Sequence, residues 1–212
     1  VEVRVPERIA FQDESCAQRY ANVLKRGVAA EHRVLPGSQL SEAAARYLYK
    51  LMAYKDEYEV ARLHTDPAFL AELDAQFPHG YEVKYNLAPP LVSERDPKTG
   101  HLQKKQYGAW MFKAFQRIAR FKNLRGGALD IFGKTEERRQ EREAIEEYIK
   151  LLDEIIAKLT TSNHAAAVAL ASVPDEIRGY GHVKEKSVAD AKKLQEERLQ
   201  AFRNPQAVKM TA

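Results

Sequence analysis

Apolar residues recur every three or four positions along most of the chain, which is the spacing that places them on one face of an α-helix. Between residues 13 and 34, Tyr20, Val23 and Leu24 share such a face. Pro36–Gly37 then ends the run. The same spacing predicts further helices over residues 43–64, 67–77, 109–121, 135–159, 165–171 and 183–202. Most of the sequence is therefore expected to be helical.

Residues that favour helix starts precede several of these segments. Ser41, Asp66 and Thr135 carry side-chain oxygens that can accept a hydrogen bond from a first-turn N–H group. Pro67 follows Asp66 at the first helical position, where its missing N–H costs nothing. These residues predict where three of the helices begin.

Two segments depart from the helical pattern. The apolar residues within positions 3–9 have the spacing of a strand end that enters a linker. Tyr81–Tyr85 alternates in a strand-like way, and Asp96–Gly100 has the composition of a tight turn. We therefore expect a mainly α, multi-helix domain with a small β-hairpin or irregular β element around residues 81–107.

The breaks in the pattern divide the chain into three expected parts. Residues 1–40 form a linker and a helix, residues 41–203 form a helical accessory domain, and residues 204–212 form a flexible tail. The chain starts at Val1 without an initiator methionine, so we expect a fragment of a longer polypeptide.

Composition narrows the class of protein. The chain has 212 residues, 44% of them hydrophobic, which excludes a disordered tail. Lys and Arg number 34 against 30 Asp and Glu, with both signs mixed along the chain, and this argues against a nucleic-acid partner. The single cysteine fits a reducing compartment. No apolar stretch reaches the roughly 18 residues of a membrane span, so we expect a cytoplasmic protein with no membrane partner.

Metal and nucleotide chemistry lack their motifs here. One cysteine cannot ligate an iron–sulfur cluster or a structural zinc ion. The six histidines include no pair four residues apart, and no glycine-rich phosphate loop is present. We therefore expect no metal and no cofactor in this chain.

The first cluster with candidate chemistry is Tyr54–Arg62. Tyr54, Tyr58 and Arg62 are spaced four residues apart, so they share one face of the predicted helix. We interpret them as an aromatic face that seals the edge of a core, with a tyrosine–arginine contact. The alternative is an acid/base site formed, if buried together, by Lys55, Asp56 and Glu59.

The second cluster is the glycine-rich segment Leu124–Gly133. Arg125 and Asp130 could bind a ligand there. We favour a rigid loop at a structural interface, whose apolar Leu129 and Phe132 fill the core, because it needs fewer assumptions.

The third cluster surrounds Gly179 and Gly181, just before a predicted helix. Arg178, His182 and Lys184 could hold an anion such as a phosphate or a carboxylate at the helix N-terminus. We favour a structural interhelical turn, in which Arg178 pairs with a helix carboxylate, over this candidate anion site.

Four segments together carry a family resemblance: Lys50–Leu63, Leu87–Pro90, Leu124–Thr135 and Ile177–Lys184. In this order and spacing, the sequence from Ala44 to Ala189 resembles the C-terminal region of the fused bacterial indolepyruvate ferredoxin oxidoreductases, which belong to the 2-oxoacid:ferredoxin oxidoreductase family. Residues before Ala44 resemble the helical exit from the gamma-like module that precedes this region in the family.

The resemblance implies a parent enzyme that oxidatively decarboxylates aryl-2-oxo acids to acyl-CoA, using thiamine diphosphate and iron–sulfur clusters and passing electrons to ferredoxin. It places the cofactor motifs in earlier parts of the polypeptide, so this chain is expected to hold no catalytic residue. Its implied role is a structural and interaction domain that packs against other domains of the same polypeptide or a second subunit. A subsidiary hypothesis is that Arg178, His182 and Lys184 help to hold the phosphates of coenzyme A.

Two other functions remain compatible with the residues. A free-standing helical module could bind a protein or nucleic-acid partner through the charged helices that begin near Glu136 and Val183. An independent enzyme could use buried carboxylates such as Asp56 and Glu59, which requires a cleft and shifted pKa values.

Overall fold

The computed structural model describes residues 4–88, 93, 103–179 and 182–205, with the backbone alone at residue 182. Helices dominate the described residues, and their one sheet is a two-stranded antiparallel hairpin, so the predicted fold class is confirmed. The chain forms two compact units, residues 1–54 with 139–212 and residues 55–138. The predicted division at residue 40 falls inside the first unit.

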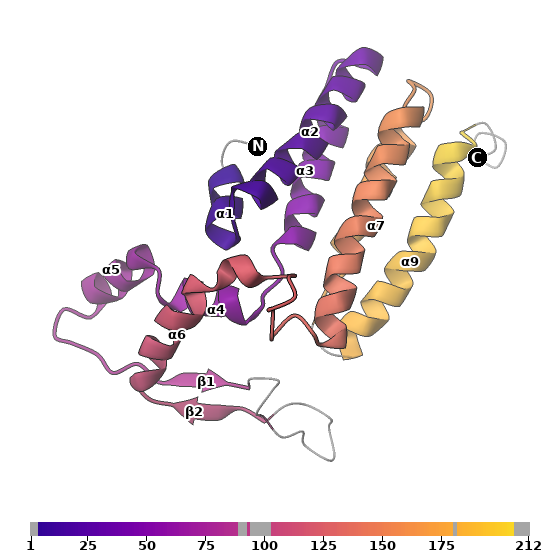
Figure 1. Ribbon diagram of the computed structural model, residues 1–212. Helices are drawn as coiled ribbons and strands as arrows, with labels where there is room; N and C mark the ends of the chain where they lie inside the picture. The colour runs from indigo at the N-terminus through magenta and orange to yellow at the C-terminus, as the bar shows by residue number, and fades with distance from the viewer. Residues whose placement is uncertain (1–3, 89–92, 94–102, 180–181, 206–212) are drawn as a thin grey trace. The chain divides into compact units, whose positions relative to one another are not determined.

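The first unit begins with three helices, α1 (Arg4–Phe11), α2 (Glu14–Val34) and α3 (Gln39–Met52) (Figure 1). Asp13 starts α2, because its carboxylate accepts a hydrogen bond from the Cys16 N–H at 2.8 Å. The strand end predicted within residues 3–9 is wrong, because residues 4–9 belong to α1.

Tertiary contacts explain why α1 is helical. The buried Arg8 guanidinium donates a hydrogen bond to the Met52 carbonyl at the end of α3. It also lies over the rings of Phe11 and Tyr49. A helix of eight residues is marginal by itself, so contacts with a distant segment decide its structure and the local pattern does not.

The start of α3 also differs from its prediction. Ser41 does not cap this helix, which begins at Gln39. The buried carboxylate of Glu31 in α2 accepts hydrogen bonds from the N–H groups of Leu40 and Ser41, both at 2.8 Å. A side chain from the neighbouring helix therefore satisfies the free N–H groups of α3.

The rest of the first unit contains α7 (Glu136–Lys158) from Arg139 onward, α8 (His164–Ala171), the short 3₁₀-helix η2 (Val173–Glu176) and α9 (His182–Arg203). α7 and α9 run side by side and parallel (Figure 1). Ion pairs join them near both ends, between Lys184 and Glu141 at 2.6 Å and between Arg203 and Glu154 at 2.7 Å. The helices predicted for this region are confirmed.

One apolar core joins α2, α3, α7, α8 and α9. Its almost inaccessible members include Leu24, Leu48, Ile155, Leu170 and Phe202, one from each of these helices. Each such side chain contributes about 1.5–3 kcal/mol to the free energy of unfolding. The Tyr148 hydroxyl enters this core and donates to the Ala171 carbonyl at 2.6 Å, so its polar atom is satisfied.

The second unit contains α4 (Glu57–His64), α5 (Pro67–Gln76), β1 (Tyr85–Leu87), β2 (Lys105–Tyr107), α6 (Trp110–Arg120) and the 3₁₀-helix η1 (Lys122–Leu124). In the hairpin, Tyr85 pairs with Tyr107. The small core of this second unit consists of Ala61, Tyr85, Met111 and Phe115. The predicted cap of α5 is confirmed, because Asp66 accepts from the Ala68 N–H at 2.9 Å. The predicted turn at Asp96–Gly100 lies outside the described residues.

The helix predicted over residues 43–64 is interrupted. α3 ends at Met52, and α4 begins anew at Glu57. The Asp56 carboxylate accepts from the Glu59 N–H at 2.8 Å, the hydrogen bond of a helix N-cap. No proline or glycine marks this break, which is why the sequence pattern misses it.

Candidate functional site

A buried ion pair lies at the start of α4 in the second unit. The Arg125 guanidinium donates from Nε to Asp56 Oδ2 at 2.5 Å and from Nη2 to Asp56 Oδ1 at 2.8 Å. The two side chains are only 2% and 4% exposed. Because Asp56 also caps α4, this two-point pair joins the helix to the segment that follows η1.

Asp130 organises the glycine-rich segment beside this pair. Its carboxylate accepts from the N–H groups of Gly126 at 2.7 Å and Gly133 at 2.8 Å. The Tyr58 hydroxyl donates to the same carboxylate at 3.2 Å. Burial, together with the adjacent Asp130 charge, raises the pKa of Tyr58 to about 12. Tyr58 therefore stays a neutral donor at physiological pH.

These contacts give the network a structural character. Asp56 and Asp130 bind a guanidinium, backbone N–H groups and a hydroxyl from this same unit, so both carboxylates already have several partners. Glu57 differs from these two aspartates in its protonation. Burial raises the pKa of its carboxyl, and the positive charge of Arg138 offsets only part of that rise. That carboxylate is 3.9 Å from the Arg138 Nε atom.

The alternative acid/base site is not assembled as a pair of carboxylates. Glu59 binds the forked guanidinium of Arg62 at 2.7 and 2.9 Å, whereas Asp56 binds Arg125. Each carboxylate thus has its own arginine, from within α4 for Glu59 and from the segment after η1 for Asp56.

The predicted single face of Tyr54, Tyr58 and Arg62 is wrong, because the break between α3 and α4 separates the first residue from the other two. Tyr54 belongs to the first unit, where its ring meets that of Phe11 edge to face at 5.7 Å. Tyr58 lies in α4 and packs against the Phe132 ring at 5.2 Å.

The loop around Arg125 and Asp130 follows the favoured structural interpretation in part. Both charged residues are buried and bind partners within the second unit. Phe132 packs on Tyr58 as expected. Leu129 does not fill the core, because it is 73% exposed. Asp130 draws the backbone around its own carboxylate, and this turns Leu129 outward.

Arg178 and Lys184 each bind a different carboxylate. Arg178 Nη2 is 3.2 Å from Asp175 Oδ2, in η2, and Lys184 Nζ is 2.6 Å from Glu141 Oε1, in α7. The side chain of His182 lies outside the described part of the chain. The Arg178 pair agrees with the interhelical-turn interpretation, while anion binding at these residues stays a prediction.

Sequence reasoning did not find the buried pair of Glu31 and His164. The His164 Nε2 atom at the start of α8 is 2.8 Å from Glu31 Oε1 in α2, and the Glu31 side chain is fully buried. Burial acts to raise the pKa of Glu31, but hydrogen bonds from Ser41, His164 and backbone N–H groups lower that pKa overall. The one available signal was a glutamate among apolar positions of a helix.

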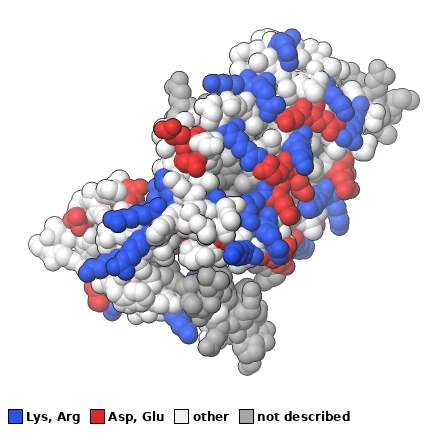
Figure 2. Space-filling view, in the orientation of Figure 1, with Lys and Arg blue, Asp and Glu red and all other residues white. Residues whose placement is uncertain are grey.

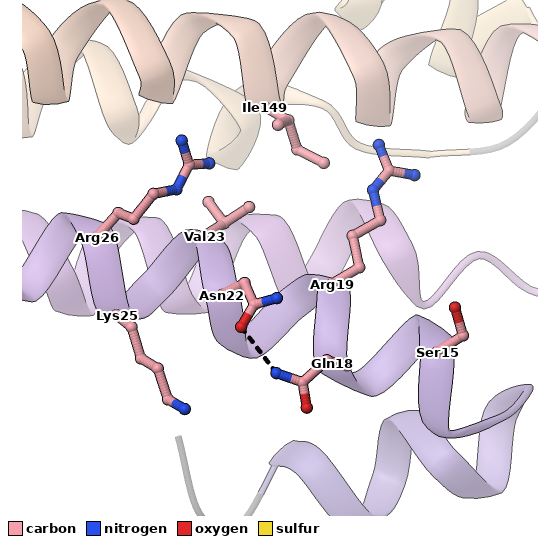
Figure 3. Close-up of a pocket in the computed structure, with 8 residues that line it drawn as sticks. All are labelled: Ser15, Gln18, Arg19, Asn22, Val23, Lys25, Arg26 and Ile149. Atoms are coloured by element: carbon pink, nitrogen blue, oxygen red, sulfur yellow. Dashed lines mark hydrogen bonds between the residues drawn. The ribbon is translucent and has the colours of Figure 1, made fainter.

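A shallow groove of about 820 Å³ lies between α2 and α7 (Figure 3). Arg19 and Arg26 extend from α2 toward α7 along it. They pair with Glu146 at 2.5 Å and Asp153 at 2.8 Å on α7. Ion pairs between the two helices therefore bridge this groove.

The outer face of α6 has a contrasting composition. Trp110 is 61% exposed, Phe121 is 57% exposed, and the cations between them are also exposed. In the space-filling view, Lys and Arg side chains gather over α6 (Figure 2). Sequence reasoning noted the aromatic residues of this helix but assigned them no surface role.

Comparison with known protein families shows to which family the chain belongs. The pattern of the family described as "Family of unknown function (DUF6537)" matches residues 1–197. The chain belongs to the DUF6537 family. No curated protein matches the chain, and no solved structure matches it.

Two further properties concern metals and membranes. Within the described residues, no group of three or more His, Cys, Asp or Glu side chains could hold a metal ion. No helix in the described part of the DUF6537 chain is both long and apolar enough to cross a membrane.

Proposed function

We propose that this chain is a non-catalytic helical interaction domain of an enzyme like the indolepyruvate ferredoxin oxidoreductases. The observation that carries the proposal is the pairing of buried polar and charged side chains with one another and with backbone groups of the same unit, as in Arg125–Asp56 and Glu31–His164. Charges used in this way stabilise two rigid units and leave the outer helix faces for binding.

The resemblance of residues 44–189 supports the choice of parent enzyme. In this proposal the domain packs against other domains of the same polypeptide or against a second subunit, and it fixes the geometry between the decarboxylation and electron-transfer sites. Thiamine diphosphate, iron–sulfur clusters and coenzyme A act in the parent enzyme, which passes electrons to ferredoxin in the cytoplasm. The domain itself transfers neither electrons nor acyl groups.

Immunoprecipitation from source cells tests the proposal. An antibody against this chain should recover a polypeptide several times larger than 24.1 kDa. The recovered protein should reduce ferredoxin in a reaction that requires an aryl-2-oxo acid and coenzyme A. A native polypeptide near 24.1 kDa without this activity would overturn the proposal and favour a free-standing binding module.

A further inference from the structure

The outward side of α6 carries a regular stripe of side chains, called here the α6 stripe and formed by Trp110, Lys113, Arg117, Arg120 and Phe121. The first four residues are separated by three, four and three positions, so they follow one line along the helix. Each of the five is exposed. At a rise of about 1.5 Å per residue, the stripe is about 16 Å long, with an aromatic ring at each end.

The charged residues that neighbour the α6 stripe in the sequence are all positive. Residues 103–129 include no Asp or Glu, and their cations are Lys104, Lys105, Lys113, Arg117, Arg120, Lys122 and Arg125. Within the described part of the chain, Lys113, Arg117 and Arg120 have no ion pair or side-chain hydrogen bond. By contrast, the exposed Arg19, Arg26 and Arg203 of the first unit all bind carboxylates.

The exposed aromatic rings indicate a binding surface. The Trp110 ring meets Tyr107 of β2 edge to face at 5.9 Å, and the residue is still 61% exposed. Tryptophan and arginine are the residues that most often dominate the energy of protein interfaces. The stripe therefore combines two apolar anchors with three cations that pair with no carboxylate among the residues that the structure describes.

We propose that the α6 stripe binds an acidic helical segment of a partner protein. The proposal rests on the interaction-domain function given above and names the surface and the chemistry of its partner. Carboxylates three and four residues apart on a partner helix have the same repeat as Lys113, Arg117 and Arg120. Arginine suits such a partner, because its planar fork can bind a carboxylate at two points.

The observations favour an acidic protein over a nucleic acid or a membrane. The chain as a whole mixes both signs, with a net charge of only +4, so it lacks the extended positive field typical of nucleic-acid binders. The apolar side of α6 is packed in the core through Met111 and Phe115. That side is consequently not available to insert into lipid, as an interfacial amphipathic helix would do.

Fluorescence anisotropy with a defined probe tests the inference. The probe is a labelled helical peptide of about 20 residues, long enough to form a helix, with glutamates at alternating three- and four-residue spacing and leucines at both ends. The same peptide with glutamine in place of glutamate is its control. The chain should bind the acidic probe at low salt at least about tenfold more tightly than the control, and added salt should weaken this binding.

Variants assign the binding to the stripe. The triple variant Lys113→Glu, Arg117→Glu, Arg120→Glu should weaken binding at least tenfold, and Trp110→Ala should weaken it by about tenfold. The matched control, Lys25→Glu, Lys192→Glu, Lys193→Glu, changes net charge equally at exposed positions on α2 and α9 and should retain binding. Circular dichroism establishes that each variant has the helical content of the parent chain.

Two outcomes overturn the inference. One is equal loss of binding in the stripe variant and the matched control, which would indicate a non-specific charge effect. The other is tighter binding of a single-stranded oligonucleotide than of the acidic peptide, with the same dependence on the stripe. Neither outcome alters the result expected from immunoprecipitation, so failure of this inference is distinguishable from failure of the proposed function.

Discussion

Asp56 and Arg125 are buried together, with side chains only 4% and 2% exposed to solvent. Arg125→Met should lower the free energy of unfolding by about 3–5 kcal/mol, because it leaves a buried carboxylate without its counter-charge. Adding Asp56→Asn should restore part of this loss, since asparagine keeps an acceptor for the Glu59 N–H but carries no charge. Urea denaturation of the single and double variants measures both effects.

An exposed arginine provides the matched control for that experiment. Arg178 also pairs with an aspartate, but its side chain is 70% exposed. Arg178→Met should therefore change the free energy of unfolding by no more than about 0.5 kcal/mol. Equal losses at Arg125 and Arg178 would contradict the assignment of Arg125 as a buried structural residue.

Glu31 gives the first unit a dependence on acid pH. Its folded pKa lies below the usual value of 4.5, so the stabilisation from the charged carboxylate is complete above that value and is lost as the pH falls through the folded pKa. Glu31→Gln should lower the free energy of unfolding by about 1–3 kcal/mol at neutral pH. This difference should shrink below pH 4.5.

Urea denaturation of wild type and Glu31→Gln across this pH range checks the expectation. The difference between the two proteins removes the contribution of titrating groups that do not contact Glu31. A difference that stays constant down to strongly acid pH would show that the charge of Glu31 contributes nothing.

The sequence predicted which residues matter at this scale better than it predicted their partners. Arg125, Asp56 and Asp130 were all candidates, yet Arg125 and Asp56 came from two clusters 69 residues apart. Helical spacing reports neighbours within three or four positions and carries no information on pairs at that distance. The prediction that Leu129 fills the core was wrong for a similar reason. The hydrogen bonds of Asp130 determine the direction in which the loop presents its side chains.

Two glycines allow a test at the scale of elements. Gly27 lies within α2, where an added methyl group would meet no heavy atom within 4 Å beyond its own helix backbone. Gly179 precedes α9 with a φ of +86°, and an added methyl group would lie 2.6 Å from Val183 Cγ1.

Gly27→Ala should raise the free energy of unfolding by about 0.5–1 kcal/mol, because alanine loses less backbone entropy in a helix. Gly179→Ala should lower it by about 1–2 kcal/mol, because its left-handed backbone is costly for any residue with a Cβ atom. Thermal unfolding of both variants in parallel measures the contrast. Stabilisation by both substitutions would exclude a left-handed backbone at Gly179.

The start of α5 followed the sequence, because its capping group is local. Asp66 with Pro67 started α5 as expected. The start of α3 was missed because its N–H groups bind Glu31 from another helix. The break before α4 was missed because an aspartate that pairs with Arg125 replaces the usual proline or glycine. Tertiary contacts thus account for these two boundaries that local propensity did not predict.

At the scale of the whole chain, the first unit combines residues 1–54 with 139–212, so its core joins helices that a separate unit interrupts in sequence. Composition shifts and breaks suggested a continuous domain over 41–203, because they cannot report which helices return to the same core. The two units have separate apolar cores. Each core is therefore expected to stabilise its own unit.

Native-state hydrogen exchange on the full chain tests this independence, because amides that open together share one free energy of opening. Arg125→Met should speed exchange mainly in residues 55–138, and Glu31→Gln should speed it mainly in residues 1–54 and 139–205, so each variant serves as the other's control. We expect this pattern because substitutions at distant sites that share no partners usually affect stability independently. Faster exchange throughout the chain in both variants would instead mean that the two cores unfold as one cooperative structure.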